Sequence, residues 1–220
     1  MTKEILVVGA TGRVGQRVMQ LLQNNVAYHV VGTSSHPTAE SPLIKLDLHD
    51  DLESIRQVVA QFDIVFFTAG SRGKDLLQVD LNGNVKIAQA AEQVGVERFV
   101  QLSSIKSLNQ KGWSTPKAGD LTDYNIARHF ADQVITQSKL DYTIVQAGSL
   151  LETEPTHKIN VYPIGEMGQR VNLDEAQNRG NTLDDVADVL TETLNYPNLA
   201  QRVIEIENGD TPITEALSQI

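Results

Sequence analysis

A glycine-rich turn near the amino terminus has the spacing of a phosphate-binding loop. The sequence GATGRVG, residues 9–15, follows an apolar run at 5–8 and precedes a segment of helical period at 14–22. In such a turn the first glycine permits a tight bend, the second lets the backbone approach a pyrophosphate, and the third lets the helix pack against the sheet. The N–H groups and the positive end of the helix then face the anion. We therefore predict that a dinucleotide binds here, with contacts from Gly9, Thr11, Gly12, Arg13, Val14 and Gly15.

The residues that follow the second apolar run, 30–33, bear on which dinucleotide is bound. Proteins that use NAD usually carry an Asp or Glu at this point to hold the ribose 2′-hydroxyl, whereas this chain has Ser34, Ser35 and His36. A carboxylate would repel a 2′-phosphate, while hydroxyl and imidazole groups can donate hydrogen bonds to one. The forked guanidinium of Arg13 could reach the same phosphate. The sequence favours NADP as the cofactor, with NAD as the alternative; a polar loop that contacts no ligand is the other interpretation.

Short apolar runs alternate with longer segments of helical period over the first 150 residues. The runs lie at 5–8, 30–33, 43–46, 64–68, 99–102 and 142–145, and the helical segments at 14–22, 52–61, 74–94 and 123–138. Alternating strands and helices with continuously apolar strands predict a parallel sheet covered on both faces, and right-handed crossovers make it doubly wound. The expected fold class is therefore an α/β Rossmann fold that binds NAD(P).

The pattern changes after Gly148. Residues 149–181 hold several prolines and glycines and have little periodicity, after which a helix is expected at 183–194, a strand at 203–206 and a helix at 212–217. Thr182, with Asp185 three residues later, has the spacing of a capping box. We expect one domain over 1–220: a nucleotide-binding core at 1–150, a lid or substrate wall at 150–181, and a closing helix-strand-helix unit at 182–220.

Composition excludes several classes of function. The 220 residues include 18 basic and 28 acidic side chains, a net charge of −10, and no cysteine. A disulfide scaffold, a thiol nucleophile and a zinc site built on sulfur are thereby excluded, and the histidines lack metal-like spacing, so we predict no metal. Acidic surfaces disfavour nucleic acid and anionic membranes. Without a signal peptide or an 18-residue apolar run, we expect a cytoplasmic protein, monomeric or homodimeric.

Several motifs together resemble the atypical short-chain dehydrogenase/reductase family. They are GATGRVG at 9–15, LDLHD at 46–50, FFTAG at 66–70, RFVQLSS at 98–104, YNIAR at 124–128, DYTIV at 141–145 and NGDTPITEAL at 208–217. The most similar subset is that of the small, single-domain NAD(P)-binding proteins related to NmrA and to biliverdin/flavin reductase. The resemblance covers essentially the whole chain and implies a Rossmann fold.

The resemblance also implies cofactor contacts beyond the glycine turn. Asp47 would accept a hydrogen bond from the adenine amino group, with Leu48 donating from its backbone; without the resemblance, Asp47 as a helix cap is an equal interpretation. The small residues Ala69 and Gly70 would let the ribose lie against the backbone. Gln-Ala-Gly stands at 146–148 where relatives have Arg-Pro-Gly. The backbone of Gly148, Ser149 and Leu150 would still flank the nicotinamide.

Tyr124 and Arg128 are four residues apart on a helical segment and so share one face. The resemblance maps them onto the family's Tyr-x-x-x-Lys pair, in which the tyrosine exchanges the proton that accompanies hydride transfer, and the cation holds the nicotinamide ribose. It places Ser104 where a hydroxyl contacts the reacting oxygen, and Ser103 precedes it at the sheet edge that binds ligands. Arginine keeps the charge of lysine, but its planar fork cannot place that charge at the same point. The alternative is that Tyr124 packs beneath the cofactor, Arg128 binds ribose or a surface carboxylate, and Ser104 caps a turn.

Three functions remain open. The first is an NADP-dependent oxidoreductase that acts on a small carbonyl, quinone or flavin-like compound, and the retained Tyr124 and Ser104 favour it. The second is a non-catalytic NAD(P) sensor like NmrA, which the change from lysine to Arg128 favours. The third is a nucleotide-sugar epimerase or dehydratase, although about 70 residues after Gly148 leave little room for such a substrate. The sequence does not identify the small-molecule substrate.

Overall fold

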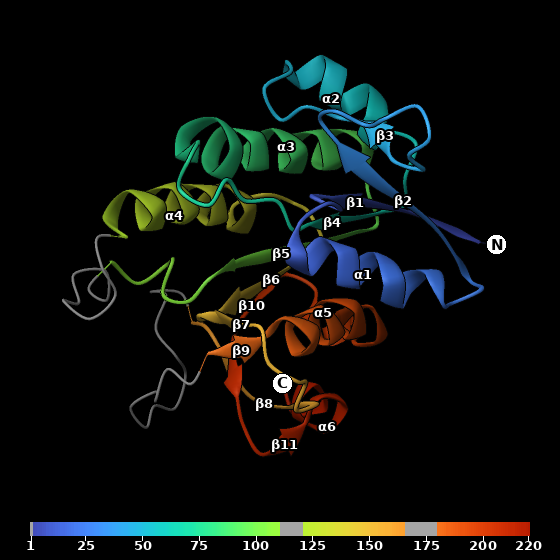
Figure 1. The fold of residues 1–220 in the computed structure, drawn as a ribbon. Coiled ribbons are helices and arrows are strands. Elements are labelled where there is room, and N and C mark those ends of the chain that lie inside the picture. The colour runs from blue at the N-terminus through green and yellow to red at the C-terminus, as the bar shows by residue number, and fades with distance from the viewer. Residues whose placement is uncertain (1, 111–120, 166–179) are drawn as a thin grey trace.

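The computed structural model describes residues 2–110, 121–165 and 180–220, which form an α/β fold around one large sheet (Figure 1). The sheet has nine strands among these residues, in the order β11-β8-β10-β6-β5-β4-β1-β2-β3. Their bounds are β1 Lys3–Val8, β2 Tyr28–Ser34, β3 Ile44–Lys45, β4 Ile64–Phe67, β5 Arg98–Ser104, β6 Tyr142–Ala147, β8 Lys158–Pro163, β10 Arg202–Asn208 and β11 Thr211–Pro212. Two further short strands, β7 (Leu150–Leu151) and β9 (Asn181–Thr182), pair with each other.

The strands from β10 to β3 in this order are all parallel, which confirms the predicted doubly wound sheet. Strand β1 lies between β2 and β4, so Ile5 is opposite both Val30 and Ile64. The chain builds the sheet outward from β1 to β3 and then returns to β4 on the other side of β1. Such a reversal is the topological switch point at which open α/β sheets bind their ligands.

The far edge of the sheet departs from the prediction of a purely parallel arrangement. Strand β8 runs antiparallel to both β10 and β11, so part of the segment 150–181, expected as a lid or substrate wall, is a sheet strand. The prolines and glycines on either side of this strand are typical of loops, so the sequence pattern did not indicate a strand here. Pro163 is tolerated because β11 pairs only with Lys158 and Ile159, so that β8 has β10 alone beside it at Pro163. Residues 166–179 of that segment lie outside the described residues.

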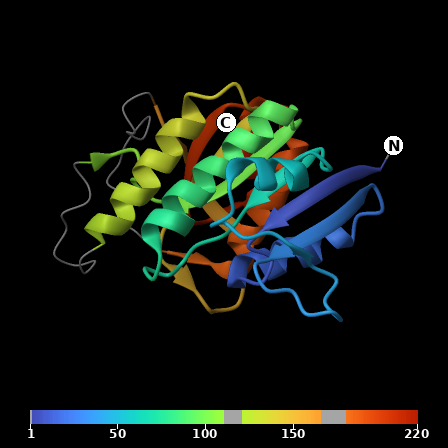
Figure 2. The same cartoon turned by 90° about the horizontal axis from the view of Figure 1, so that it is seen from above.

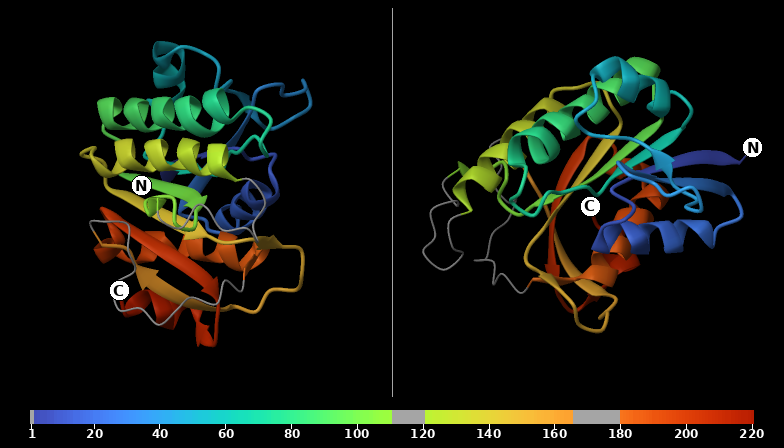
Figure 3. Two further views of the ribbon diagram at one scale, coloured as in Figure 1. Left: turned by 90° about the vertical axis from the view of Figure 1, so that its left-hand side faces the viewer. Right: turned by 45° about the horizontal axis from the view of Figure 1, so that its top comes forward.

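Helices cover both faces of the sheet, and their buried stripes form two cores (Figures 1 and 2). One face carries α2 (Leu52–Val59), α3 (Asn84–Val94) and α4 (Thr122–Thr136), and the other carries α1 (Arg13–Gln23), α5 (Leu183–Glu192) and α6 (Ile213–Ser218). The two views of Figure 3 show the same layers from the side and from an oblique angle. None of the helices in the described ranges is both long and apolar enough to cross a membrane.

The single helix predicted at 74–94 is in fact two elements. A π-helix, η1 (Leu76–Gly83), precedes α3 and places Asp80 in the interior. Gly83 ends it at a close approach, because a Cβ atom there would lie 2.8 Å from both Leu48 Cβ and Gln78 O. Helical periodicity does not distinguish π from α turns over so short a stretch. π turns are rare and often occur at functional sites.

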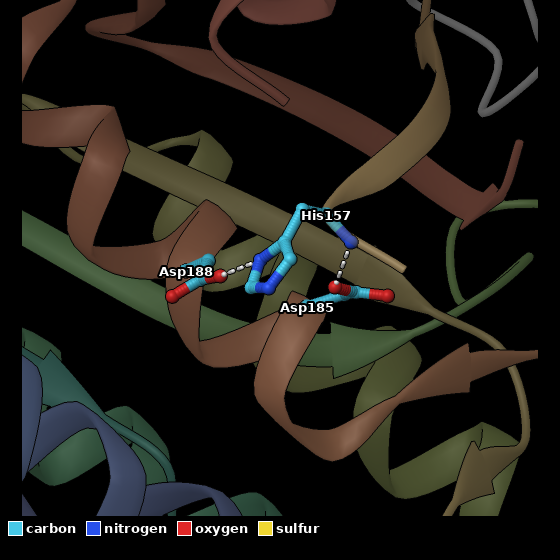
Figure 4. A group of neighbouring side chains, drawn as sticks. All are labelled: His157, Asp185 and Asp188. Carbon is cyan, nitrogen blue, oxygen red and sulfur yellow. Dashed lines mark hydrogen bonds and ion pairs between the residues drawn. The ribbon is translucent and has the colours of Figure 1, made fainter. Parts of the chain in front are cut away.

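A buried aspartate at the start of α5 anchors the entry to β8. Thr182 caps the helix by accepting a hydrogen bond from Asp185 N at 3.0 Å, as the capping-box spacing predicts. The Asp185 carboxylate instead accepts hydrogen bonds from the backbone of Thr156 and His157, and His157 Nδ1 lies 3.1 Å from Asp188 (Figure 4). The buried carboxylate of this cluster is thus satisfied by donors from the chain itself.

Candidate functional site

One cavity of about 800 Å³ opens at the carboxyl ends of the parallel strands. It lies at the switch point between β1 and β4, where α/β sheets bind ligands. All of the predicted site residues except Gly15 line it: Gly9, Thr11, Gly12, Arg13, Val14, Ser34, Ser35, His36, Asp47, Leu48, Ala69, Gly70, Ser103, Ser104, Tyr124, Arg128, Gly148, Ser149 and Leu150. Segments far apart in the sequence are therefore brought together around a single space.

The glycine turn between β1 and α1 has no room for side chains on its inner side. Gly9 has a φ of +86°, and a Cβ there would lie 2.6 Å from Ala69 N at the end of β4. Gly12 is the N-cap of α1, and its N–H donates to Gly9 O at 2.9 Å. A Cβ on Gly15 would lie 2.2 Å from Gly9 O, so this glycine allows α1 to pack against the turn.

The amino end of α1 is arranged to receive an anion. The first N–H groups of a helix have no partner within the helix, and no side chain in the described ranges caps this one. Its open N–H groups and the positive end of its dipole therefore face the cavity, as a pyrophosphate requires. An uncapped helix end at the edge of the cavity fits the pyrophosphate of a dinucleotide cofactor.

Polar side chains at the end of β2 hydrogen-bond among themselves. Ser35 Oγ lies 3.0 Å from His36 Nδ1, and His36 N donates to Ser34 Oγ at 3.2 Å. The three residues are accessible from the cavity. Their hydroxyl and imidazole groups could exchange these local hydrogen bonds for hydrogen bonds to a ligand phosphate.

Asp47 after β3 is held in place by His49, which was not among the predicted site residues. Asp47 Oδ1 accepts hydrogen bonds from His49 N at 2.9 Å and from His49 Nδ1 at 2.8 Å, and these keep the pKa of Asp47 below its ordinary value. The other ring nitrogen of His49 lies 2.7 Å from Asp75 Oδ2. Hydrogen bonds to Asp47 and then Asp75 raise the pKa of His49. Asp47 Oδ2 is left available to accept from a ligand.

Arg13 makes a contact that the sequence did not indicate. Its Nη1 donates to Glu152 Oε1 at 2.8 Å, across 139 residues of chain. This hydrogen bond lowers the pKa of Glu152, and the charges of Arg17 and Arg72 act in the same direction. The guanidinium expected at the 2′-phosphate is therefore paired with the segment after β7. A phosphate would have to compete with Glu152 for it.

Tyr124 and Arg128 lie on one face of α4, as their spacing predicts. Arg128 Nε donates to Tyr124 Oη at 3.4 Å, and the guanidinium carbon lies 5.6 Å from the centre of the tyrosine ring. Arg128 Nη2 donates to Ala69 O at 3.3 Å and lies 3.7 Å from Asp80 Oδ1. The hydroxyl of Tyr124 thus accepts from Arg128, which leaves its own proton available for donation.

Ser103 and Ser104 end β5 in different environments. Ser103 is buried and its Oγ donates to Asp132 Oδ2 at 2.7 Å, so that proton is directed into the protein. Asp132 also accepts from Gln101 Nε2 at 2.6 Å and from Ser107 Oγ, and burial nevertheless raises the pKa of its carboxyl. Ser104 is partly exposed and lines the cavity. Of the two serines, Ser104 is better placed to contact a ligand.

Seven further polar residues line the cavity and were not among the predicted site residues: Thr33, His49, Thr68, Arg72, Asp80, Lys106 and Asn125. Arg72 and Lys106 have φ values of +56° and +60°, a left-handed conformation that side chains rarely adopt. Such conformations often occur at functional sites. The sequence carries no signal for them, because neither is a glycine or asparagine. Asn125 could have been noted beside Tyr124.

Comparisons with known proteins agree with this site. A profile of NAD(P)H-binding proteins matches residues 9–197. The chain belongs to this NAD(P)H-binding family. Its structure is similar to that of the oxidoreductase ylbE from Lactococcus lactis, with 34% identity, a TM-score of 0.85, and coverage of 99% of this chain and 96% of that one.

Two curated relatives match over nearly their whole lengths. The uncharacterized sugar epimerase YhfK of Bacillus subtilis is 29% identical over 228 residues, covering 99% of this chain and all of the relative. The UPF0659 protein YMR090W of Saccharomyces cerevisiae is 29% identical over 231 residues, covering 99% and 98%. The family confirms the predicted Rossmann fold and NAD(P) binding, and it is consistent with the resemblance to atypical short-chain dehydrogenases/reductases.

Proposed function

We propose that the protein is an NADP-dependent reductase of a small carbonyl, quinone or flavin-like compound, with Tyr124 as the proton donor. The observation that carries this proposal is the hydrogen bond from Arg128 Nε to the Tyr124 hydroxyl at 3.4 Å. Because that hydroxyl acts as an acceptor toward Arg128, its proton is free to be donated into the cavity. Ser104 on the neighbouring strand end supplies a hydroxyl to hold the reacting oxygen.

The proton balance of the proposed reaction is simple. NADPH, held by the glycine turn and Arg128, would supply the hydride chemistry at the substrate carbonyl carbon. Tyr124 donates its proton to the oxygen that becomes negative, and Ser104 hydrogen-bonds to that oxygen. The resulting tyrosinate is stabilised by the adjacent Arg128 until solvent returns a proton. Arg128 also lies where a fixed positive charge favours the developing negative charge.

The preference for NADP is supported by the residues at the end of β2. No carboxylate stands among residues 33–36 to bind a free 2′-hydroxyl or to repel a 2′-phosphate. The hydroxyls of Ser34 and Ser35 and the ring of His36 are accessible from the cavity. Arg13 adds positive charge to the same cavity, although Glu152 competes for it.

A sugar epimerase is a second candidate, because one relative carries that name. The cavity argues against a nucleotide-sugar substrate. Ligand sites of roughly 300–1,000 Å³ accommodate one drug-sized ligand, and this cavity of about 800 Å³ must already hold a dinucleotide. A small carbonyl compound needs less of the cavity volume that remains beside the dinucleotide than a nucleotide sugar does.

The test is a titration with NADPH and NADH, followed by a panel of carbonyl, quinone and flavin substrates monitored by NADPH oxidation. Tyr124→Phe should lower turnover by about 10²–10⁴-fold, the usual contribution of general acid catalysis, with little change in NADPH affinity. Tyr28→Phe is the matched control, since Tyr28 begins β2 at the end opposite the cavity; it should retain wild-type turnover.

Each of three other outcomes would contradict a different part of the proposal. Full turnover by Tyr124→Phe would contradict the role of Tyr124. Tight NADPH binding without turnover on any substrate would favour the sensor like NmrA. Absence of binding to both nucleotides would refute the reductase proposal altogether.

A further inference from the structure

A buried carboxylate behind the proposed proton donor has an incomplete set of partners. Asp80 on η1 is fully buried, and its Oδ2 accepts a hydrogen bond from Ser71 N at 3.0 Å. Its Oδ1 has no hydrogen-bond partner in the described ranges and lies 3.7 Å from Arg128 Nη2. The two side chains are only 1% and 5% exposed. Asp80 therefore contributes a negative charge directly beside the Arg128 cation, where solvent screens it little.

The nitrogens of Arg128 are divided among three directions. Nε donates to the Tyr124 hydroxyl, and Nη2 faces Ala69 O and Asp80. Nη1 is buried and has no partner within the described chain, although Arg128 lines the cavity. A guanidinium is planar and rigid, so fixing the directions of two nitrogens fixes the third.

We propose that Asp80 is a positioning residue that holds the Arg128 fork in this orientation. With Nη2 held by Asp80 and Ala69 O, Nε meets the Tyr124 hydroxyl and Nη1 is presented to the ribose of the cofactor. The inference rests on the proposed function, because it assumes that a dinucleotide ribose occupies the space beside Arg128. It concerns Asp80, a residue outside the Tyr-x-x-x-Arg motif.

The chemistry of arginine explains why such a residue is needed. A lysine ammonium is a compact charge whose three N–H donors rotate freely, whereas a guanidinium donates only along fixed directions in its plane. Gly70 provides the necessary space, since a Cβ atom there would lie 3.3 Å from Asp80 Oδ1 and 3.4 Å from Arg128 Nη2. The pair is therefore packed closely against the end of β4, where the cavity begins.

The test is a double-mutant cycle in the full chain, with Asp80→Asn, Arg128→Met and the double variant. NADPH and NADH are the probes, and both the dissociation constant and the melting temperature are measured. Asparagine keeps the shape of Asp80 but removes the charge that holds Nη2. We expect each single substitution to weaken NADPH binding roughly 10-fold or more, the effect of one hydrogen bond to a charged donor.

The cycle distinguishes positioning from a structural role. If Asp80 acts through Arg128, Asp80→Asn should change the dissociation constant less than about twofold in the Arg128→Met background. The double variant should also melt above Arg128→Met, because it removes a buried carboxylate that has lost its cation. Asp185→Asn is the matched control, since Asp185 is equally buried but lies outside the cavity lining. It should lower the melting temperature without changing NADPH affinity.

Wild-type NADPH affinity in folded Asp80→Asn would overturn the inference and leave the cofactor assignment intact. An equal loss of affinity in both backgrounds would overturn it as well, because Asp80 would then act independently of Arg128. If the unmodified protein binds neither nucleotide, the proposed function fails and the inference with it. Should Asp80→Asn not fold, Asp80→Ser removes the same charge, leaves room for water, and carries the same test.

Discussion

Replacing Gly15 by alanine tests whether the turn before α1 is the pyrophosphate site. The new Cβ would lie 2.2 Å from Gly9 O and 2.8 Å from Thr68 Oγ1. Neither neighbour is free to retreat, because Gly9 O accepts from Gly12 N and Thr68 Oγ1 donates to Val8 O. The helix must therefore move away from the turn by about 0.8 Å to reach 3.0 Å, the separation below which Cβ contacts essentially do not occur.

The cost to folding is modest and the cost to binding is larger. Overpacking at a tight contact destabilises by roughly 1–3 kcal/mol, and alanine regains up to about 1 kcal/mol relative to glycine inside a helix. The protein should therefore still fold. A shift of the first turn of α1 misaligns its N–H groups with the pyrophosphate, and each hydrogen bond to a charged group contributes about 1.5–3 kcal/mol. NADPH affinity should fall at least 10-fold.

Thermal unfolding and NADPH fluorescence titration measure the two effects separately. Gly95→Ala is the control, because Gly95 has a φ of +77° with no atom within 4 Å of the added Cβ. It should lose about 1–2 kcal/mol of stability to left-handed strain and keep wild-type affinity. Folded Gly15→Ala protein that binds NADPH as tightly as the unmodified chain would refute the assignment of the turn.

Three further predictions concern charge. Ser35→Asp should weaken NADPH binding by repulsion of the 2′-phosphate and leave NADH binding unchanged or improved; equal losses would mean that the 2′-position is misplaced. The pKa of His49, followed by NMR, should lie above its ordinary value of about 6.5 and should fall in Asp75→Asn. The contribution of protonated His49 to the free energy of unfolding is therefore complete below about pH 6.5 and is lost as the pH rises through the raised pKa. Burial raises the pKa of Asp132, so its carboxylate becomes destabilising as the pH rises above about 4. The melting temperature of Asp132→Asn, measured relative to that of the unmodified protein, should therefore increase as the pH rises above about 4. A difference between the two melting temperatures that does not change with pH would contradict this prediction.

Features of the fold that depend on neighbouring residues were predictable from the sequence. The glycine turn, the seven parallel strands and the Thr182 cap follow from patterns within a few residues, because backbone conformation and burial periodicity are local properties. The common edge of a parallel sheet then brings the strand ends together. This is why so many predicted site residues line one cavity without any knowledge of tertiary contacts.

Features that depend on pairing between distant segments were not predictable. Strand β8 forms because β10 and β11 offer edges for it, although the sequence on either side of it has the composition of a loop. The Arg13–Glu152 ion pair joins residues 139 positions apart. The partner of Arg128 lies on a π-helix, within a segment that the sequence pattern predicted as part of one longer helix. Charge pairing of this kind has no periodic signal.

The inner face of α4 connects these distant contacts into one unit. Tyr124, Arg128 and Asp132 follow one another at intervals of four residues and so lie along the same side of the helix. The first faces the cavity, the second is held by Asp80 from η1, and the third accepts a hydrogen bond from the hydroxyl of Ser103 on β5. A displacement of α4 would therefore move the proposed proton donor and its cation together relative to Ser104, the next residue of β5. The distance between donor and substrate anchor thus depends on two buried carboxylates, neither of which contacts the substrate in the proposed reaction.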